Sequence, residues 1–316
     1  MKPLNVFPYD SAIPFMRMRW ASLAVAALLL VVSLGSIATR GFNFALDFTG
    51  GTVTEVRFER PVDLDDARAR LEAAGYESPQ VQTLGSGNDL LIRLQPREGT
   101  GEGAAQRTAD DVLAAVATAD NPGTIVKSDF VGPQVGEELA LNGIYAAMFV
   151  VFGFAAYISF RFEWKFAAAA IATTMHDIIV VLGWFSLMGR EFDLTVLAGV
   201  LSVMGFSIND TIVVFDRVRE NFRGMRGEPK AILDRSINQT LSRTVITSFV
   251  AFLTILALYL YGGGSLEGMA EALMVGIVVG TLSTIFVACP LLLWLGASKQ
   301  DLMPKARDEE ELARRP

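Results

Sequence analysis

Cysteine and histidine are nearly absent from this chain of 316 residues, which contains one of each. A single cysteine, Cys289, excludes a disulfide within the chain and argues against a cysteine-based metal site. One histidine is too few for the H-E-x-x-H zinc motif, and the sequence contains neither a P-loop nor a G-x-S-x-G nucleophile motif. We therefore expect that the protein is not an enzyme and that it holds no metal and no cofactor.

Charged residues are also scarce over long stretches of the chain. Six apolar runs have about the 17–25 residues that a helix needs to cross a hydrocarbon core about 30 Å thick. A weak small-x-small pattern at Ser36 and Ala38 would suit a cleaved secretory signal, but the length of the first run and the five runs after it favour a retained helix. The chain is thus predicted to span the lipid bilayer six times, at Trp20–Thr39, Leu139–Phe160, Phe166–Met188, Phe192–Phe215, Val245–Tyr261 and Ala270–Gly296.

Basic residues gather at one end of these predicted helices. The positive-inside rule assigns such segments to the cytoplasm. On the opposite side, Gly189–Glu191 is a tight turn and Gly262–Glu271 carries only acidic charges. Both termini are therefore expected in the cytoplasm, with the long hydrophilic segment outside. The basic residues that support this orientation are Lys2, Arg17, Arg19, Arg161, Lys165, Arg217, Arg219, Arg223, Arg226, Lys230, Arg235, Lys299, Lys305 and Arg307.

The hydrophilic segment between the first two helices is predicted to be a small α+β domain. Alternating residues at Thr52–Phe58 indicate a strand, and Asp63 is a candidate N-cap of the helix that follows. Strands from Val81 and Leu90, a helix over 104–119 and a strand over 124–131 complete a β-α-β-β-α-β order, which is that of a ferredoxin-like split unit. The Gly-rich stretch Gly99–Gly103 is expected to be a connector, because it lacks the lysine and hydroxyl residue of a phosphate-binding loop.

The expected fold is therefore an α-helical polytopic membrane protein with six transmembrane helices and a small α+β ferredoxin-like domain on the periplasmic side. Most of the negative charge lies in that domain, so we expect no nucleic-acid partner. Between the fourth and fifth helices, residues 216–243 are predicted to form two short amphipathic helices at the cytoplasmic interface, broken at Gly224–Pro229, which contact lipid or dock a cytoplasmic protein. The predicted segments are a cytoplasmic N-terminus (1–19), the first transmembrane helix (20–39), the α+β domain (40–138), the remaining five transmembrane helices (139–298) and a cytoplasmic tail (299–316).

Asp210 is the most unusual residue of the predicted helices. An ionised aspartate inside a bilayer is disfavoured by at least about 2.5–3.5 kcal/mol, so it is expected to face the bundle interior or a water pathway. Arg243 lies near the same end of the next, antiparallel helix, at a depth that permits an ion pair. Separating the two would make Asp210 take up a proton, whereas a purely structural salt bridge would not move. Candidate proton-relay neighbours are Ser207, Asn209, Thr211, Thr247 and Ser248.

His176 and Asp177 form a second polar point, at a similar depth in the third predicted helix. Histidine is the side chain best suited to titrate near neutral pH. The alternative is that the two residues only hydrogen-bond within the bundle. Asp177 and Asp210 could also pair as in an intramembrane aspartyl protease, but neither lies in the GxGD context of such enzymes.

Four motifs identify a likeness to a known family. They are DFTGG at Asp47–Gly51, MHDIIVVLG at Met175–Gly183, GFSINDTIVVFDRVREN at Gly205–Asn221 and TLSRTVITS at Thr240–Ser248. With these motifs and its layout of one helix, an outer domain and five helices, the chain resembles the SecF family, subunits of the bacterial SecDF protein-export complex within the resistance-nodulation-division superfamily.

The resemblance implies a function and a set of partners. SecF proteins pair with SecD and associate with the SecYEG channel in the inner membrane, where the proton gradient helps to complete export of unfolded preproteins on the periplasmic side. Asp210 matches the family's proton-relay aspartate and Arg243 its arginine, whereas the motif of His176 and Asp177 has no assigned role. Asp47, Gly50 and Gly51 belong to a family signature that would be either a hinge or a tight approach of the backbone.

Two other functions remain open from the sequence. A proton-driven exporter of small solutes or lipids from the same superfamily would usually carry two repeats in one chain, whereas this chain has one and therefore calls for a partner. A non-transporting assembly scaffold would need Asp210 and Arg243 only for packing. The sequence does not distinguish H⁺ from Na⁺ as the coupling ion.

Overall fold

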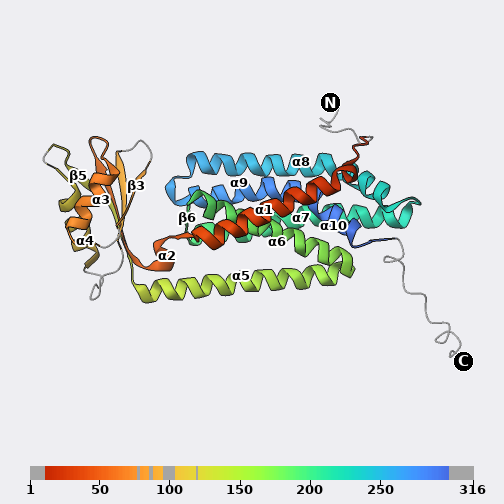
Figure 1. The fold of residues 1–316 in the computed structure, drawn as a ribbon, viewed down its shortest axis with the longest axis horizontal. Helices are drawn as coiled ribbons and strands as arrows, with labels where there is room; N and C mark the ends of the chain where they lie inside the picture. Colours follow the sequence, from red (N-terminus) through yellow and green to blue (C-terminus); the bar gives the residue numbers. More distant parts are fainter. Residues whose placement is uncertain (1–10, 77–78, 85–87, 95–103, 119, 299–316) are drawn as a thin grey trace, which may run out of the picture. The chain divides into compact units, whose positions relative to one another are not determined.

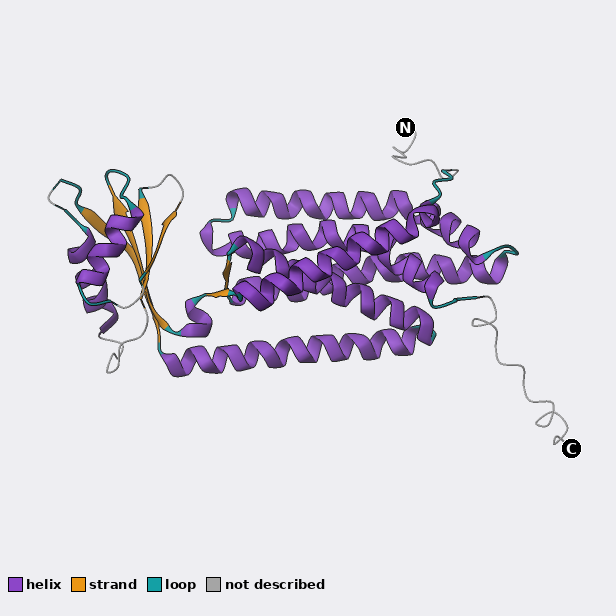
Figure 2. Ribbon diagram, in the orientation of Figure 1, coloured by secondary structure: helices purple, strands orange, loops and turns teal. Residues whose placement is uncertain are grey.

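The computed structural model describes residues 11–76, 79–84, 88–94, 104–118 and 120–298. These residues form two compact units (Figure 1, Figure 2). The helical unit contains residues 11–43, 147–190 and 195–298, and the sheet domain contains residues 44–146 and 191–194. The predicted Gly-rich connector, the basic residues before 11 and the charged tail after 298 lie outside the described residues.

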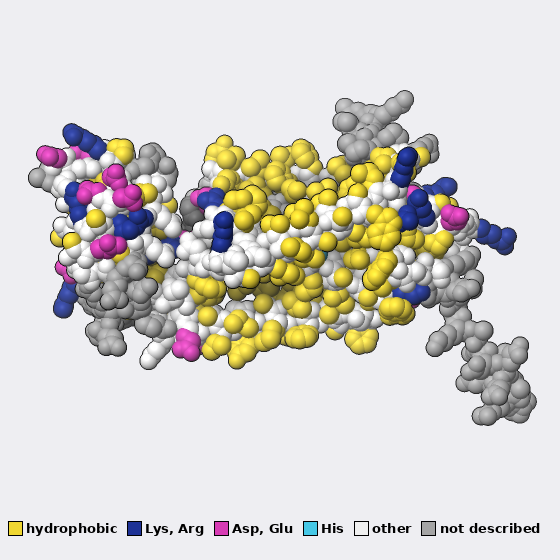
Figure 3. Space-filling model, viewed as in Figure 1, with side chains coloured by type: hydrophobic (Ala, Val, Ile, Leu, Met, Phe, Trp, Pro, Cys, Tyr) yellow, Lys and Arg dark blue, Asp and Glu magenta, His cyan; other side chains and the backbone are white. Residues whose placement is uncertain are grey.

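Within the described residues, six helices are long and apolar enough to cross a membrane, which confirms the predicted number of spans. Exposed apolar side chains such as Leu28, Val31, Phe149 and Phe152 face outward from these helices, and Figure 3 shows the hydrophobic cover that results. This surface suits the acyl chains of a bilayer. The helices are η1 (Phe15–Met18) with α1 (Arg19–Arg40), α5 (Pro133–Arg161), α6 (Trp164–Met188), α7 (Leu194–Gly224), α8 (Pro229–Tyr261), and α9 (Gly264–Ser283), which continues through η2 (Thr284–Ala288) into α10 (Cys289–Trp294).

The last span is not a uniform helix. Its middle turn, η2, is a π-helix that ends directly before Cys289 and Pro290. Proline has no N–H group and removes one regular hydrogen bond of the helix, so the wider π turn lies where the α-helical pattern is interrupted. The preceding part begins earlier than predicted, because Glu267 and Glu271 lie within α9 rather than in a loop.

Interior packing is concentrated on α6, α7 and the last span, which have the largest buried shares among the six helices of the described chain. Gly276 of α9 lies against Val203 of α7, and Gly280 lies against Ser207, where an added Cβ would be 3.3 Å from the serine Cβ. The small-xxx-small spacing of Gly276 and Gly280 therefore brings two helices into close contact. This contact sets the distance between the polar residues of α7 and those of α9.

The segment 216–243 differs from the prediction of two separate interfacial helices. The break at Gly224–Pro229 is present, but α7 runs without interruption to Gly224 and α8 runs from Pro229 to Tyr261. Asn221 Nδ2 donates to Ser236 Oγ at 2.8 Å and joins the two extensions. Their apolar residues do not face lipid but enter the bundle core, where the buried set includes Val218, Phe222, Ile232, Leu233 and Ile237.

The sheet domain has the predicted β-α-β-β-α-β order. Its sheet has the strand order β3-β4-β2-β5 with antiparallel neighbours, as expected for the split unit. Asp63 caps α3 by accepting the N–H groups of Asp65 and Asp66. The elements are β2 (Gly51–Phe58), α3 (Leu64–Ala73), β3 (Gln80–Leu84), β4 (Asp89–Leu94), α4 (Ala104–Val116) and β5 (Gly123–Val131).

Three short elements complete this domain. The strands β1 (Asn43–Phe44) and β6 (Glu191–Phe192) pair with each other, and the four-residue helix α2 (Leu46–Thr49) lies between β1 and β2. Ala45 N donates to Phe192 O at 2.9 Å. The chain that precedes β2 is therefore bonded to the chain that precedes α7.

Candidate functional site

Polar side chains of α7 are placed on two faces of the helix. Ser207 and Thr211 are buried, as expected for residues four apart on one face, whereas Asn209 is exposed and Asp210 lies between these faces, half-buried. The helix therefore presents Asp210 at the edge of the packed interior.

Asp210 is held by a chain of hydroxyl groups from two other helices. Ser248 of α8 donates through Oγ to Asp210 Oδ2 at 3.2 Å. Thr281 of α9 lies with its Oγ1 2.8 Å from Ser248 Oγ and donates to it. The predicted neighbour Ser248 is thus a direct partner of Asp210, and Thr281 extends the chain.

Arg243 is not the direct partner of Asp210 in this structure. It is close enough to act on the carboxylate through its charge, but among the described residues no ion pair joins them. Ser248 lies five residues beyond Arg243 in α8, about 7.5 Å along the helix axis at 1.5 Å per residue. The expected ion pair is therefore offset by more than one helical turn, because the register of α8 brings Ser248 and not Arg243 to Asp210.

A cavity of about 70 Å³ adjoins Asp210. A water molecule occupies about 30 Å³ in the liquid, and a cavity needs polar groups to retain one. This cavity meets both conditions and has room for about two water molecules. Its lining includes the predicted residues Ser207, Asn209, Asp210, Thr247 and Ser248, together with Phe206, Gly276, Ile277, Gly280 and Thr281.

Ser248 is the one predicted neighbour that bonds to the carboxylate in the described chain, and the hydroxyl groups of Thr247 and Thr211 bond elsewhere. Thr247 lines the cavity, but its Oγ1 donates to Arg243 O within α8 at 2.9 Å. Thr211 lies beyond the cavity, where its Oγ1 is 3.0 Å from Ser207 O and 3.2 Å from Thr284 Oγ1. These residues stabilise the helices around the site without touching Asp210.

His176 and Asp177 form a second polar centre in the bundle interior. Asp177 is fully buried, and His176 Nδ1 lies 2.9 Å from its Oδ1. The other carboxylate oxygen, Oδ2, accepts Ser207 Oγ at 2.6 Å and Ser283 Oγ at 2.7 Å. Ser207 therefore belongs to both polar centres, since it also lines the cavity beside Asp210. No group of three or more histidine, cysteine or acidic residues among the described ones could hold a metal ion.

The sequence reasoning missed Thr281 and Ser283, which donate to the two centres. Both lie in the last predicted span, Ala270–Gly296. A signal was present, because hydroxyl residues follow Gly276 and Gly280 at Thr281, Ser283 and Thr284 in an otherwise apolar helix. Small residues that allow close approach and hydroxyls that follow them mark the interior face of this helix.

The DFTGG motif has its own contacts in the sheet domain. Asp47 of α2 accepts the backbone N–H of Leu194 through Oδ2 at 3.1 Å, and Leu194 is the first residue of α7. Helix N-termini leave N–H groups unpaired and carry partial positive charge, so a carboxylate there is favourable. Asp47 therefore caps the helix that carries Asp210.

A buried arginine lies near this cap. Arg93 of β4 forms an ion pair with Glu191, and its charge also interacts with Asp193 and Asp47. Burial lowers the pKa of Arg93, and the two aspartates partly oppose this shift. The sheet is thereby bonded through its own strand to the segment that leads into α7.

The two glycines of the motif allow the chain to turn into the sheet. Gly50 and Gly51 have φ values of +67° and +123°, which residues other than glycine rarely adopt. An added Cβ on Gly51 would meet the carbonyl oxygen of Leu94. The motif therefore fulfils the predicted tight approach of the backbone; whether it also acts as a hinge stays a prediction.

Comparison with known proteins places these features in a family. Residues 111–298 match the family model described as protein export membrane protein SecD/SecF, C-terminal, and residues 35–62 match the SecD/SecF GG motif. The chain is 46% identical over 304 residues to the protein translocase subunit SecF of Pseudomonas aeruginosa, with 94% of this chain and 96% of that protein covered.

Two longer proteins are also similar. The protein translocase subunit SecDF of Brucella abortus is 36% identical over 312 residues, which cover 98% of this chain and 41% of the relative. The crystal structure of SecDF, a translocon-associated membrane protein from Thermus thermophilus, superposes with a TM-score of 0.82 at 36% identity, covering 92% of this chain and 40% of that one.

Proposed function

Because this chain belongs to the SecD/SecF family of protein-export membrane proteins and is an accessory subunit of the Sec translocase, we propose that it couples the proton gradient to late steps of export by binding and releasing a proton at Asp210. The main observation in support of this proposal is the position of Asp210. Its carboxyl group accepts a hydrogen bond from Ser248 beside a polar cavity, and Arg243 is within electrostatic range but forms no ion pair with it.

The proposed partner in the membrane is SecD. Relatives named SecDF carry more than twice the length of this chain, of which it covers about two fifths. Along one face of α7, the residues Ser202, Gly205, Phe206 and Asn209 are exposed just before Asp210. Small and polar residues let a second helix approach closely. A SecD helix on this face would cover the cavity and complete the site.

The proposed mechanism alternates between two arrangements of α7 and α8. With Asp210 on Ser248, a single serine hydroxyl is the one side chain bonded to the carboxyl group in the described chain, and a charged carboxylate without a cationic partner in a bilayer costs at least about 2.5–3.5 kcal/mol. We assign the protonated acid to this arrangement. A slide of α8 by about 7.5 Å, the axial distance between Ser248 and Arg243, would exchange Ser248 for Arg243 and stabilise the carboxylate.

Motion of α7 is proposed to reach the sheet domain through Asp47. Its bond to Leu194 ties α2 to the first residue of α7, and Gly50 and Gly51 follow directly with their positive φ angles. A displaced α7 would therefore pull on the chain that enters β2. The sheet domain would then hold or release a preprotein emerging from the SecYEG channel.

The proposal includes an orientation and a mode of action. The chain is a multi-pass membrane protein, and we assign it to the bacterial inner membrane with both termini in the cytoplasm and the sheet domain in the periplasm. The work is mechanical and needs no enzymatic chemistry. A passive scaffold would not use the hydroxyl chain at Asp210, and a proton-driven exporter of small solutes would not use an unfolded preprotein.

The test is Asp210→Asn in proteoliposomes that contain the chain, its SecD partner and the SecYEG channel. Asparagine keeps the size and the hydrogen bond to Ser248 but cannot release a proton. We expect complex assembly to be retained and gradient-dependent stimulation of preprotein export to be lost. The matched control is Asp216→Asn, which removes an exposed carboxylate of the same helix that pairs with Arg161 at 2.7 Å. Full stimulation in Asp210→Asn would rule out the proposed role of this residue.

A further inference from the structure

Asp177 is a buried carboxylate that the proposed cycle at Asp210 does not use. It is 0% exposed and accepts hydrogen bonds from three side chains on three helices. A bond to Oδ2 from Ser207 at 2.6 Å and another from Ser283 at 2.7 Å are short, as is typical of charge-assisted hydrogen bonds to an ionised acceptor. The surroundings of Asp177 are therefore built to hold a negative charge.

His176 supplies the third bond and leaves one ring nitrogen free. Its Nδ1 is bound to Asp177 Oδ1, whereas Nε2 is buried and has no hydrogen-bond partner in the described structure. With Asp177 ionised, Nδ1 carries the hydrogen and Nε2 presents its lone pair. The atom that would accept a proton is thus Nε2.

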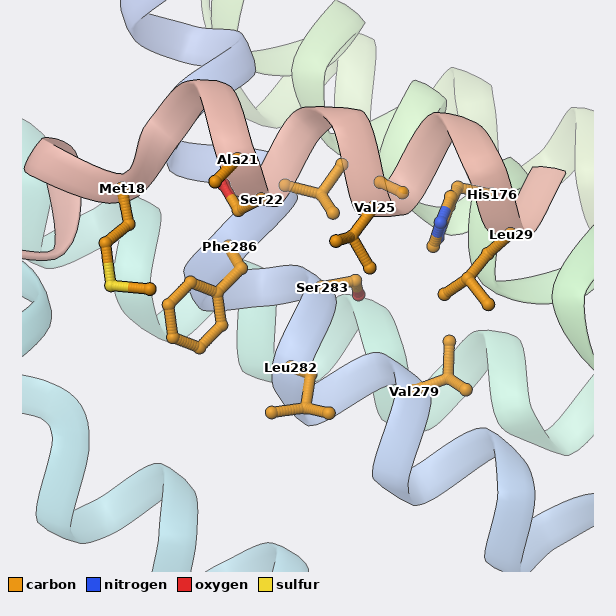
Figure 4. A pocket seen from close by; sticks show the side chains of 12 residues that line it. Met18, Ala21, Ser22, Val25, Leu29, His176, Val279, Leu282, Ser283 and Phe286 are labelled. Carbon is orange, nitrogen blue, oxygen red and sulfur yellow. The ribbon is translucent and has the colours of Figure 1, made fainter. Parts of the chain in front are cut away.

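The His176 side chain lines a groove between α1 and the last span. Figure 4 shows His176 beside Leu29 and Ser283 in this groove, which has a volume of about 280 Å³. Along α1 it extends from Met18 to Leu29, about 16 Å at 1.5 Å per residue. The groove therefore runs from the His176 side chain to the start of α1, at the end of the bundle where the basic residues gather.

The charges around His176 come from one neighbour. His176 of α6 is the only titratable residue that lines the groove in the described chain. The other lining residues belong to α1, to the residue before it and to the last span. On α6 the facing group is Asp177, and on α7 it is Ser207, with Asp210 one turn further along. A proton at Nε2 would thus be stabilised by Asp177 and influenced through Ser207 by Asp210.

Ser207 can transmit this influence because its hydroxyl has a single hydrogen. That hydrogen is donated to Asp177, while the same side chain lines the cavity beside Asp210. When His176 becomes an imidazolium, the charge of Asp177 is neutralised and its hold on the serine hydrogen weakens. The hydrogen then becomes available to an ionised Asp210 or to water in the cavity.

We propose that His176 and Asp177 form a second proton-binding site of the bundle, coupled to Asp210 through the hydroxyl of Ser207. One N–H bond forms at Nε2 when the proton binds and breaks when it leaves, and no electron is transferred. This inference rests on the proposed role of Asp210 in proton binding. Because coupling between two sites is reciprocal, the charge state of Asp210 must change the proton affinity of His176.

The test uses the fact that His176 is the only histidine of the chain. The full chain, labelled with ¹⁵N-histidine and purified with a histidine-free tag, is reconstituted in nanodiscs with its unlabelled partner. The nitrogen signals of His176 are followed against pH and assigned by their loss in His176→Gln. We expect a titration whose midpoint falls by about 0.5 pH unit or more in Asp210→Asn, a roughly threefold weaker proton affinity, because the variant can no longer adopt the arrangement in which Asp210 is a carboxylate.

A double-mutant cycle then tests the path. In the Ser207→Ala background, Asp210→Asn should no longer change the titration midpoint of His176. In the control background Ser186→Ala, Asp210→Asn should lower this midpoint as much as in the wild type. Ser186 is a buried serine of the same helix as His176 that bonds Ser36 at 2.9 Å. A His176 signal that does not titrate, or a midpoint that ignores Asp210→Asn, would overturn the inference.

The two proposals fail in different ways. Loss of gradient-driven export in Asp210→Asn together with an unresponsive His176 would remove the second site and keep the proposed function. Normal export in Asp210→Asn would remove the proposed function, while a midpoint shift in the same variant would still establish coupling between the two sites.

Discussion

Asp47 accepts the backbone N–H of Leu194 at 3.1 Å and thereby caps α7, the helix that carries Asp210. Asp47 and Leu194 are 147 residues apart in the sequence, so this cap joins the DFTGG motif to a helix that begins much later. The motif is therefore not only a bend between α1 and the sheet.

Replacing the cap should weaken the start of α7. We expect Asp47→Ala to lower the stability of the purified chain by about 0.5–2 kcal/mol, the usual cost of losing an N-cap side chain. Asp47→Asn, which retains an acceptor oxygen, should lose much less. Thermal unfolding in detergent measures both, and equal melting temperatures for the wild type and Asp47→Ala would contradict the capping role. The control is Asp110→Ala, an exposed aspartate of α4.

The contact of Gly276 with Val203 predicts a large effect for a small side chain. Gly276→Ala places a methyl group against Val203 and should destabilise the helical unit by about 1–3 kcal/mol, as overpacking does. Val203→Ala in the same chain should restore part of the loss. Gly205→Ala, where nothing lies within 4 Å of the added Cβ, is the matched control and should be neutral or stabilising in the chain without SecD.

Replacing both charges of the site separates a scaffold from a proton-coupled subunit. In a passive scaffold, Asp210→Leu combined with Arg243→Met should be harmless, because well-packed apolar residues often substitute for charged pairs. We expect the double variant to assemble with SecD and to lose gradient-driven stimulation of export. Co-purification and export are measured on the same preparation, and retained stimulation would favour the scaffold.

Acid should weaken one contact of the sheet domain selectively. Arg57 Nε donates to Asp89 Oδ1 at 2.8 Å, and this bond lowers the pKa of Asp89 from its ordinary value of 3.8. A carboxyl group with a lowered folded pKa stabilises the fold above the unfolded pKa, and the contribution is lost as the pH falls through the folded pKa.

The measurement compares the wild type with Asp89→Asn by thermal unfolding of the full chain over a range of pH. The wild type should be the more stable of the two at neutral pH, by a small margin because the pair is exposed. The difference should disappear in strong acid. Asp110→Asn provides the control, and a difference that persists at low pH would exclude the ion pair as its cause.

The sequence predicts the elements of this fold because apolar run length and strand alternation act locally. The six spans, the β-α-β-β-α-β order and the N-cap at Asp63 follow from residues that are close together in the chain. The extensions of α7 and α8 cannot be predicted in this way. Val218 and Ile237 would be apolar both at a lipid interface and in a protein core, and only the packed bundle decides which of the two they face.

The sequence singles out Asp210 and names Ser248 among its neighbours, but it does not predict which side chain contacts the carboxylate. Asp210 stands out because a carboxylate in an apolar helix is costly, whatever surrounds it. Its contact with Ser248 rather than Arg243 depends on the relative register of α7 and α8, which no local pattern encodes. Ser283 belongs to a group of hydroxyl residues with Thr281 and Thr284, but only the packed bundle shows that it lies opposite Asp177.

The π turn before Cys289 has a consequence for the last span. A helix advances by about 100° per residue, and a π turn accommodates one residue more than an α turn, so the faces of α9 and α10 are out of phase. Thr281 and Ser283 can therefore point at the two acidic centres while Cys289 and Leu292 fill the opposite end of the bundle. The π turn therefore divides the last span into two helical segments whose side chains serve different parts of the bundle.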